Sequence, residues 1–146
     1  MIKIQSVAFK NGEMIPVKYT CKGEDINPPL IIENVPPNAK SLVLIVDDPD
    51  APMGTFTHWL LWNIDPKIKE IKENSVPADA IIGTNDFGKT AYGGPCPPSG
   101  VHRYYFKVYA LNTVLDLPAG ANRSQLEKAI EGYILDYGEL MGKFSK

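Results

Sequence analysis

The 146-residue sequence has no long apolar run and no cluster of basic residues. A helix that crosses a bilayer needs roughly 18 apolar residues in succession, and no segment approaches that length. Lys and Arg number 15 against 17 Asp and Glu, which gives a formal net charge of −2 and makes nucleic acid a poor candidate partner. The first residues also lack the apolar stretch of a signal peptide. We therefore expect a soluble, cytoplasmic protein without a membrane span.

Proline is missing from the last 26 residues, although the chain contains 13 prolines and 12 glycines. Because proline costs about 3 kcal/mol inside a helix, its frequency over the first 120 residues excludes a helical bundle there. Hydrophobic residues make up 44% of the sequence and aromatic residues 10%, enough to build a core and to argue against disorder. The length predicts a single domain over residues 1–146.

Cysteine and histidine are scarce, with two residues of each. Cys21 and Cys96 belong to no CxxC pair and show no spacing typical of metal ligands. Their positions are compatible with two free thiols or with one intramolecular disulfide, and both possibilities stay open. We expect neither a metal nor a cofactor.

Short apolar segments between the prolines and glycines predict β-strands. Residues 41–46 form a continuous aliphatic run, which is typical of a central strand buried on both faces. Residues 58–64 are a second such run, and residues 101–111 are the longest, with aromatic side chains that favour a pleated surface. Three shorter segments also predict strands: 2–9 (with a bulge), 14–17 and 28–32. Frequent turns between short strands indicate a mainly antiparallel β-sandwich.

The tail of the chain has a different pattern. Ser124 and Glu127 match a capping box, which marks the start of a helix. Apolar residues then recur at helical spacing, at Leu126, Ala129, Ile130, Tyr133, Ile134, Tyr137 and Leu140. This stripe predicts a C-terminal helix packed on the sandwich. Because Gly132 costs about 1 kcal/mol inside a helix, we expect the helix to kink or to end early there.

Residues 83–90 match the P-loop pattern GxxxxGK[ST]. That motif binds phosphates because the N-terminus of a helix follows the loop directly. Residues 91–98 contain two glycines and three prolines and cannot form such a helix. We therefore reject a nucleoside triphosphatase.

The two histidines each begin an aromatic-rich strand segment after a loop. Alternation places His102 and Tyr104 on one face of their strand. The same rule places His58 on a face with Leu60, Trp62 and Ile64. Asp48 and Asp50 follow the buried run at 41–46. These polar groups either converge on one pocket at the strand ends, or each histidine merely satisfies a buried backbone group.

Three stretches carry a resemblance to a known family. They are DDPDAP at residues 47–52, THW at 57–59, and NDFGKTAYGGPCPPSGVHRYYFKVYAL at 85–111. In these motifs, in its length and in its tail, the chain is similar to the phosphatidylethanolamine-binding protein family, particularly the short bacterial and archaeal members. The likeness covers nearly the whole sequence.

The resemblance implies a Greek-key sandwich of antiparallel sheets with a small anion pocket near one end. The pocket residues that it implies are Asp48, His58, His102 and Tyr104, with Asp50, Gly94 and Pro95 around the mouth. Family members bind phosphate-bearing ligands such as phosphoethanolamine head groups, and several inhibit serine proteases or kinases. In such a pocket, Asp48 is expected to hold one histidine in the required tautomer.

We therefore expect a non-enzymatic binding protein for phosphate or a phosphorylated small molecule. The alternative is an inhibitor of serine proteases (chymotrypsin-like or elastase-like) or of kinases that acts through an exposed loop, with Met53 in one candidate loop and Leu115 and Leu117 in another. A hydrolase that uses the two histidines lacks a credible nucleophile. Apolar edge strands also make a homodimer conceivable.

Overall fold

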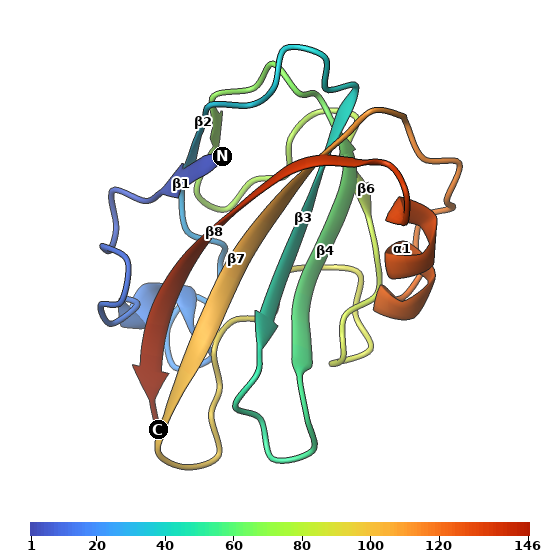
Figure 1. The fold of residues 1–146 in the computed structure, drawn as a ribbon. Coiled ribbons are helices and arrows are strands. Elements are labelled where there is room, and N and C mark those ends of the chain that lie inside the picture. The colour runs from blue at the N-terminus through green and yellow to red at the C-terminus, as the bar shows by residue number, and fades with distance from the viewer.

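Figure 1 shows two antiparallel β-sheets and one α-helix in the computed structural model, which describes residues 1–146. The larger sheet has five strands in the order β6-β4-β3-β7-β8. Its strands are β3 (Ser41–Asp48), β4 (Phe56–Ile64), β6 (Ile81–Ile82), β7 (Val101–Leu111) and β8 (Ile134–Ser145). None of the helices has the length and apolar character that a membrane crossing requires.

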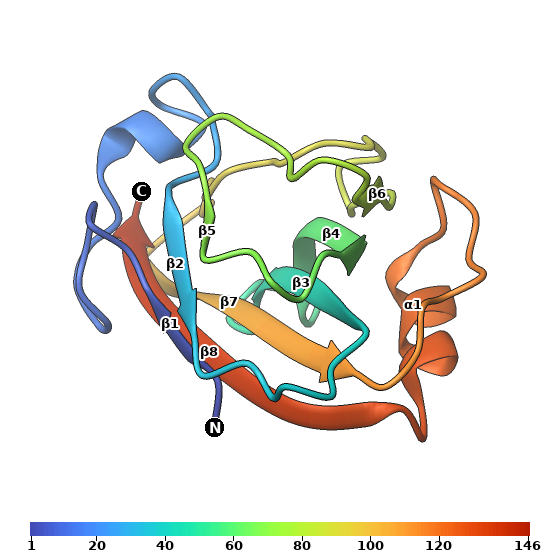
Figure 2. The same cartoon turned by 90° about the horizontal axis from the view of Figure 1, so that it is seen from above.

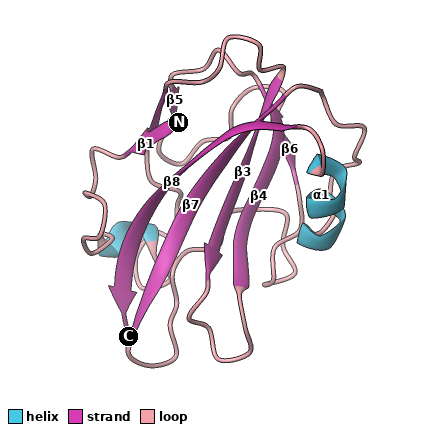
Figure 3. Ribbon diagram, in the orientation of Figure 1, coloured by secondary structure: helices cyan, strands magenta, loops and turns pink.

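The smaller sheet has three short strands in the order β1-β2-β5. They are β1 (Lys3–Gln5), β2 (Leu30–Glu33) and β5 (Glu70–Ile71). The remaining elements are the 3-10 helix η1 (Val17–Tyr19) and the helix α1 (Arg123–Ile130). Strands therefore account for most of the regular structure, as the magenta segments in Figure 3 show.

The connections of the larger sheet form a Greek key. Strands β3, β4 and β6 lie side by side, although the chain passes through β5 of the smaller sheet between β4 and β6, and β7 then returns to pair with the other edge of β3. A fourth strand that comes back beside the first by a long connection defines this topology. The predicted antiparallel Greek-key sandwich is confirmed.

Two apolar clusters hold the layers together. Twenty buried residues, among them Leu42, Leu44 and Phe106, fill the space between the two sheets. Nine others, among them Val43 and Ile45, form a second cluster with residues of α1 on the outer face of the larger sheet. Figure 2 shows α1 beside the larger sheet, away from β1, β2 and β5. Strand β3 is buried along its whole length, as its continuous aliphatic run predicts.

The predicted helix forms, packs on the larger sheet and ends early, near Gly132, but the helical pattern expected after that point is wrong. Helix α1 ends at Ile130, Gly132 adopts a positive φ of 82°, and residues 134–145 form β8, which pairs with β7 along its length. Every second residue in the second half of β8 is buried, with the less buried residues between them, which is the period of two of a strand. The buried residues are Gly138, Leu140, Gly142 and Phe144. The tail is therefore an outer strand of the larger sheet and not a helical lid.

The start of α1 also differs from the expected one. Asn122, and not Ser124, is the N-cap. The side-chain oxygen of Asn122 accepts the backbone N–H of Gln125, and the side-chain oxygen of Gln125 accepts the backbone N–H of Asn122. A buried ion pair docks the helix, because Arg123 Nη1 lies 2.7 Å from Asp47 Oδ2 on the outer face of the sheet. Lys107 Nζ contacts the same oxygen at 2.9 Å.

Near the N-terminus, regular structure is shorter than the sequence predicts. The strand expected at 2–9 covers only Lys3–Gln5, and the strand expected at 28–32 is shifted slightly, to Leu30–Glu33. The segment at 14–17 forms a single bridge, between Met14 and Lys143, before η1 begins. Pro16 interrupts the segment at 14–17, and Pro28 and Pro29 begin the segment at 28–32; each proline removes a backbone donor, so long ladders cannot form there.

Cys21 and Cys96 form a disulfide, with their Cα atoms 5.5 Å apart. The bond joins the turn after η1 to the loop before β7, across a sequence separation of 75 residues. Of the two possibilities left open by the sequence, the structure therefore selects the disulfide. Disulfides are rare in reducing compartments, although intracellular proteins of hyperthermophiles are rich in them. A cytoplasmic location, as expected from the sequence, would therefore make this protein one of those exceptions.

Candidate ligand-binding site

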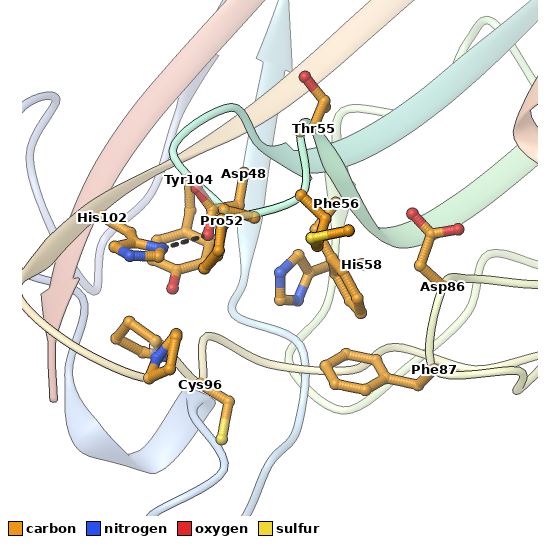
Figure 4. A pocket seen from close by; sticks show the side chains of 15 residues that line it. Asp48, Pro52, Thr55, Phe56, His58, Asp86, Phe87, Cys96, His102 and Tyr104 are labelled. Carbon is orange, nitrogen blue, oxygen red and sulfur yellow. Dashed lines mark hydrogen bonds and ion pairs between the residues drawn. The ribbon is translucent and has the colours of Figure 1, made fainter.

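A cavity of about 570 Å³ opens at one end of the larger sheet. Because β3 runs antiparallel to β4 and β7, its C-terminal end lies beside the N-terminal ends of both neighbours. This brings together Asp48 from β3, His58 from β4, and His102 and Tyr104 from β7. Figure 4 shows these four side chains bordering one space. The structure thus places the four central residues of the expected pocket around one cavity.

His102 is held by Asp48. The imidazole Nδ1 donates to Asp48 Oδ2 at 2.6 Å, and both side chains are almost completely buried. Asp48 Oδ1 accepts the backbone N–H of Asp50 at 2.8 Å, so both carboxylate oxygens are already paired. With Nδ1 committed to the carboxylate, His102 Nε2 is left without a protein partner. Asp48 therefore acts as a positioning residue that sets the tautomer of His102.

His58 is held by the backbone in the same way. Its Nδ1 donates to the carbonyl oxygen of Gly93 at 2.7 Å, which leaves Nε2 without a protein partner. The imidazole packs against the rings of Phe56, Phe87 and Tyr104, with centroids between 5.0 and 5.3 Å away. Burial among these rings lowers the pKa of His58 below its ordinary value. At neutral pH its Nε2 is therefore an acceptor, and it becomes a donor only after protonation.

The prediction that His58 shares a face with Leu60 and Trp62 is wrong, because a β-bulge lies at this point; Ile64, the third residue predicted on that face, does lie in the cluster between the sheets. Val46 pairs with Trp59 and the next residue, Asp47, pairs with Thr57, so His58 is an extra residue in the strand. The bulge turns His58 toward Tyr104 and the space between the sheets. Leu60 and Trp62 instead face α1. Simple alternation along β4 could not reveal this.

Tyr104 supplies a hydroxyl deep in the same site. The side chain is 1% exposed, and its oxygen makes no hydrogen bond within the protein. Burial raises the pKa of the hydroxyl, with the Asp48 carboxylate adding to the effect, so the phenol keeps its proton. It lies close to the backbone of Cys96 as well. A buried hydroxyl without a partner is unfavourable, and a ligand acceptor within its reach would satisfy it.

The three expected mouth residues, Asp50, Gly94 and Pro95, are not among the residues that line the cavity. The Asp50 carboxylate receives three hydrogen bonds from Arg103, which lower the pKa of Asp50 to about 2. The Gly94 N–H donates to Asp25 Oδ1 at 2.8 Å, and the Pro95 carbonyl accepts the N–H of Cys21 at 3.1 Å. In the structure these three residues therefore make hydrogen bonds within the protein.

The cavity also has apolar walls, and of these the sequence pointed only to the proline-rich stretch before His102. They are formed by Pro52, Phe56, Phe87, Pro97 and Pro98. Phe87 is 42% exposed and lies in a turn stabilised by the side chain of Asn85, whose oxygen accepts the N–H groups of residues 87 and 89. An aromatic residue inside a polar turn was the available signal for this wall. The site is therefore a polar floor below an apolar mouth.

The two candidate inhibitory loops differ in exposure. Met53 is 98% exposed and stands on the rim of the cavity. Leu115 is 7% exposed and packs in the cluster below α1, and Leu117 is half-buried beside it. The structure therefore makes Met53 available to another protein and keeps Leu115 in the core.

The Greek-key topology and the His102–Asp48 pair at the end of the larger sheet place the protein in a class of β-sandwich domains with a site at the strand ends. Within that class, the model of the family "Phosphatidylethanolamine-binding protein" matches residues 5–145. The chain belongs to this family. The resemblance seen in the sequence motifs is thus confirmed.

Relatives and solved structures agree with this assignment. A UPF0098 protein of Pyrococcus abyssi is 56% identical over 155 aligned positions, which cover 100% of this chain and 86% of the relative. The crystal structure of the phosphatidylethanolamine-binding protein homologue CT736 of Chlamydia trachomatis aligns with a TM-score of 0.95 and 43% identity, over 99% of this chain and 97% of the other. YbcL of E. coli aligns with a TM-score of 0.93 and 27% identity, over 99% and 98%.

Proposed function

We propose that the protein is a non-enzymatic binding module for small phosphorylated molecules, with phosphoethanolamine as a representative ligand. One observation carries the proposal: His58 Nε2, His102 Nε2 and the Tyr104 hydroxyl border one cavity, and none of them has a protein partner. A phosphate group requires several converging donors, and these three groups can supply them. The apolar mouth would accommodate the substituent that the phosphate carries.

The carboxylate of Asp48 does not oppose this proposal. Both of its oxygens are engaged by the His102 ring and the Asp50 N–H, so its charge is paired inside the protein. Asp48 holds the His102 ring through Nδ1 on one side, and Nε2 faces the ligand on the other. Because the imidazole is already held in place, it loses little conformational freedom when a ligand binds.

A binding role is favoured over catalysis by the groups around the imidazoles. Neither ring is hydrogen-bonded to a hydroxyl or a thiol. Cys96, the one cysteine on the wall, is occupied by the disulfide. An activated nucleophile needs such a contact with its base, so the arrangement of the site supports ligand binding.

Affinity for phosphoethanolamine should rise as the pH falls, by at least tenfold between pH 8 and pH 5.5. Because burial lowers the pKa of His58, the unliganded protein holds this ring neutral at pH 8. An anion at Nε2 requires the protonated ring, so binding takes up a proton and becomes more favourable as protons become available. Isothermal titration calorimetry at both pH values, in two buffers of different ionisation enthalpy, measures the affinity and the proton uptake.

Inorganic sulfate is the matched control, because its charge does not change over this range whereas the second pKa of a phosphate monoester is about 6. A rise in sulfate affinity assigns the effect to the protein. Equal affinities at both pH values, with no proton uptake, would contradict the proposed role of the histidines.

The exposure of Met53 favours inhibition of a serine protease as a second candidate function. A chymotrypsin-like specificity pocket is a hydrophobic slot, which an unbranched apolar side chain can enter. We expect the protein to inhibit a chymotrypsin-like or elastase-like protease, and Met53→Gly to weaken the inhibition at least tenfold. Residual protease activity at increasing inhibitor concentration measures this. No inhibition of either class would exclude the candidate.

A further inference from the structure

The disulfide lies at the cavity and not in the core. Cys96 lines the site, and both cysteines are exposed to solvent. In Figure 4 the sulfur of Cys96 points away from His58 and His102, out of the cavity. Thiol–disulfide exchange begins with attack of a thiolate on one sulfur, so an exposed bond is open to reduction whereas one enclosed in a core is protected.

The wall that Cys96 belongs to has few other attachments. Residues 91–100 lie in neither sheet. The wall is attached to β4 at Gly93, through hydrogen bonds to His58 Nδ1 and to the His58 carbonyl oxygen. Beyond Gly93, its hydrogen bonds run to residues 19–25, from Gly94 to Asp25 and from Cys21 to Pro95, and the Gly100 carbonyl oxygen accepts the N–H of Lys146.

Between the disulfide and β7, the backbone has one hydrogen bond, from the Lys146 N–H to the Gly100 carbonyl oxygen. Pro97 and Pro98 lack amide hydrogens, and residues 97–99 make no hydrogen bond to the rest of the protein. This stretch includes the proline wall of the cavity and follows the residue whose backbone approaches the Tyr104 hydroxyl. Pro97 is buried, so apart from packing at this residue the disulfide is what holds the stretch over the histidines.

We propose that the Cys21–Cys96 disulfide is a redox switch on the cavity: the oxidised protein binds ligand, and reduction releases the proline wall and weakens binding. The inference rests on the proposed binding of phosphorylated molecules. The reductant is a protein or small-molecule dithiol. One of its thiolates attacks a cystine sulfur to form a mixed disulfide, and its second thiol resolves that bond. The products are two cysteine thiols and the oxidised dithiol, with two electrons and two protons transferred to the protein.

Release of the proline wall would affect both the apolar mouth of the cavity and the His58 imidazole. The ligand would lose contact with Pro97 and Pro98, and it would have to order a mobile segment when it binds. Freed from the wall, His58 would also gain access to water, which reverses the desolvation that now acts on the ring. Reduction should therefore be detectable with and without a ligand.

The test compares the oxidised protein, the protein kept in dithiothreitol, and the Cys21→Ser/Cys96→Ser double variant. We expect phosphoethanolamine to bind the reduced protein and the double variant about tenfold more weakly than the oxidised protein, by calorimetry at pH 5.5. Dithiothreitol should have no effect on the double variant, which controls for direct effects of the reagent. Circular dichroism confirms that each form is folded at the temperature of the measurement.

A second measurement needs no ligand. The chain has two histidines, so its imidazole NMR signals can be assigned with a single His102 variant. We expect the pKa of His58 to move toward its ordinary value on reduction. If the oxidised protein does not bind, the proposed function fails, and this measurement still decides whether the wall opens. Equal affinities together with an unchanged His58 titration would show that the bond is a structural crosslink only and would overturn the switch.

Discussion

Replacing His102 by asparagine should weaken phosphoethanolamine binding about 100-fold and leave the fold intact. The asparagine amide nitrogen occupies nearly the position of the imidazole Nδ1 and can still donate to Asp48. The variant therefore keeps a buried hydrogen bond to Asp48 at the end of β3. In the native protein this bond, from His102 Nδ1 to Asp48 Oδ2, is 2.6 Å long. It lacks Nε2, the atom that faces the ligand. A hydrogen bond to a charged group contributes roughly 1.5–3 kcal/mol, and its loss corresponds to about this change in affinity.

His102→Ala is the informative companion to this variant. It removes the same ligand contact and also leaves the buried Asp48 without its imidazole partner, so we expect the unfolding free energy to fall by about 2 kcal/mol. Calorimetry at pH 5.5 and thermal denaturation of both variants measure the two effects. Full binding by His102→Asn would contradict the proposed site. If His102→Asn lost as much stability as His102→Ala, the histidine would serve the fold and not a ligand.

Loss of the disulfide should lower the unfolding free energy by about 4 kcal/mol. Cys21 and Cys96 are 75 residues apart, and closing a loop of this length in the unfolded chain removes a large part of its conformational entropy. For a domain of this size, the change corresponds to a decrease in Tm of roughly 10–15 °C. Because both residues are exposed, serine at these positions should add no penalty from buried polar groups.

Thermal denaturation of the Cys21→Ser/Cys96→Ser double variant measures this effect. The wild-type protein in dithiothreitol should unfold at the same temperature as the double variant, since both lack only the crosslink. A Tm within 2 °C of the oxidised protein would contradict the prediction and would show that the folded wall and its hydrogen bonds already hold the two segments together. The result also sets the temperature below which the reduced protein is folded for binding measurements.

The elements predicted well are those whose local pattern has one physical solution. Residues 41–46 are uniformly aliphatic, so any position other than the centre of a sheet would expose apolar surface to water. In β7, exposed or half-buried residues alternate with buried ones as far as Ala110, and its predicted bounds, Val101 to Leu111, are those of the structure. In both segments, propensity and burial favour the same conformation.

The tail shows where a local pattern is ambiguous. Over residues 133–140 the apolar positions fit a helical period as well as an alternating one. Pairing with β7 decides between them, because it satisfies backbone groups along the whole of β8. Gly138 permits this packing: a side chain there would collide with the carbonyl oxygen of Ile2. That contact joins residues 136 positions apart, so no local window contains it.

The candidate site divides in the same way. Asp48, His58, His102 and Tyr104 were predictable from the motifs, and the structure places them around one cavity. The role of each atom was not predictable. The bulge that turns His58 inward depends on the register between β3 and β4, and the paired state of Asp50 depends on Arg103 from a neighbouring strand. The wall residue Phe87 joins the site through a turn that precedes β7 by more than ten residues.

The sequence by itself determined the class of fold, the family, and the residue types available for chemistry, because these depend on composition, short-range periodicity and motifs. Only the tertiary structure decided which nitrogen of each histidine is free, which carboxylates are already paired, and that Cys21 is bonded to Cys96. Hydrogen bonds and crosslinks of this kind join residues 35 to 75 positions apart. They form only after the strands have paired, since strand register sets the distances between their atoms.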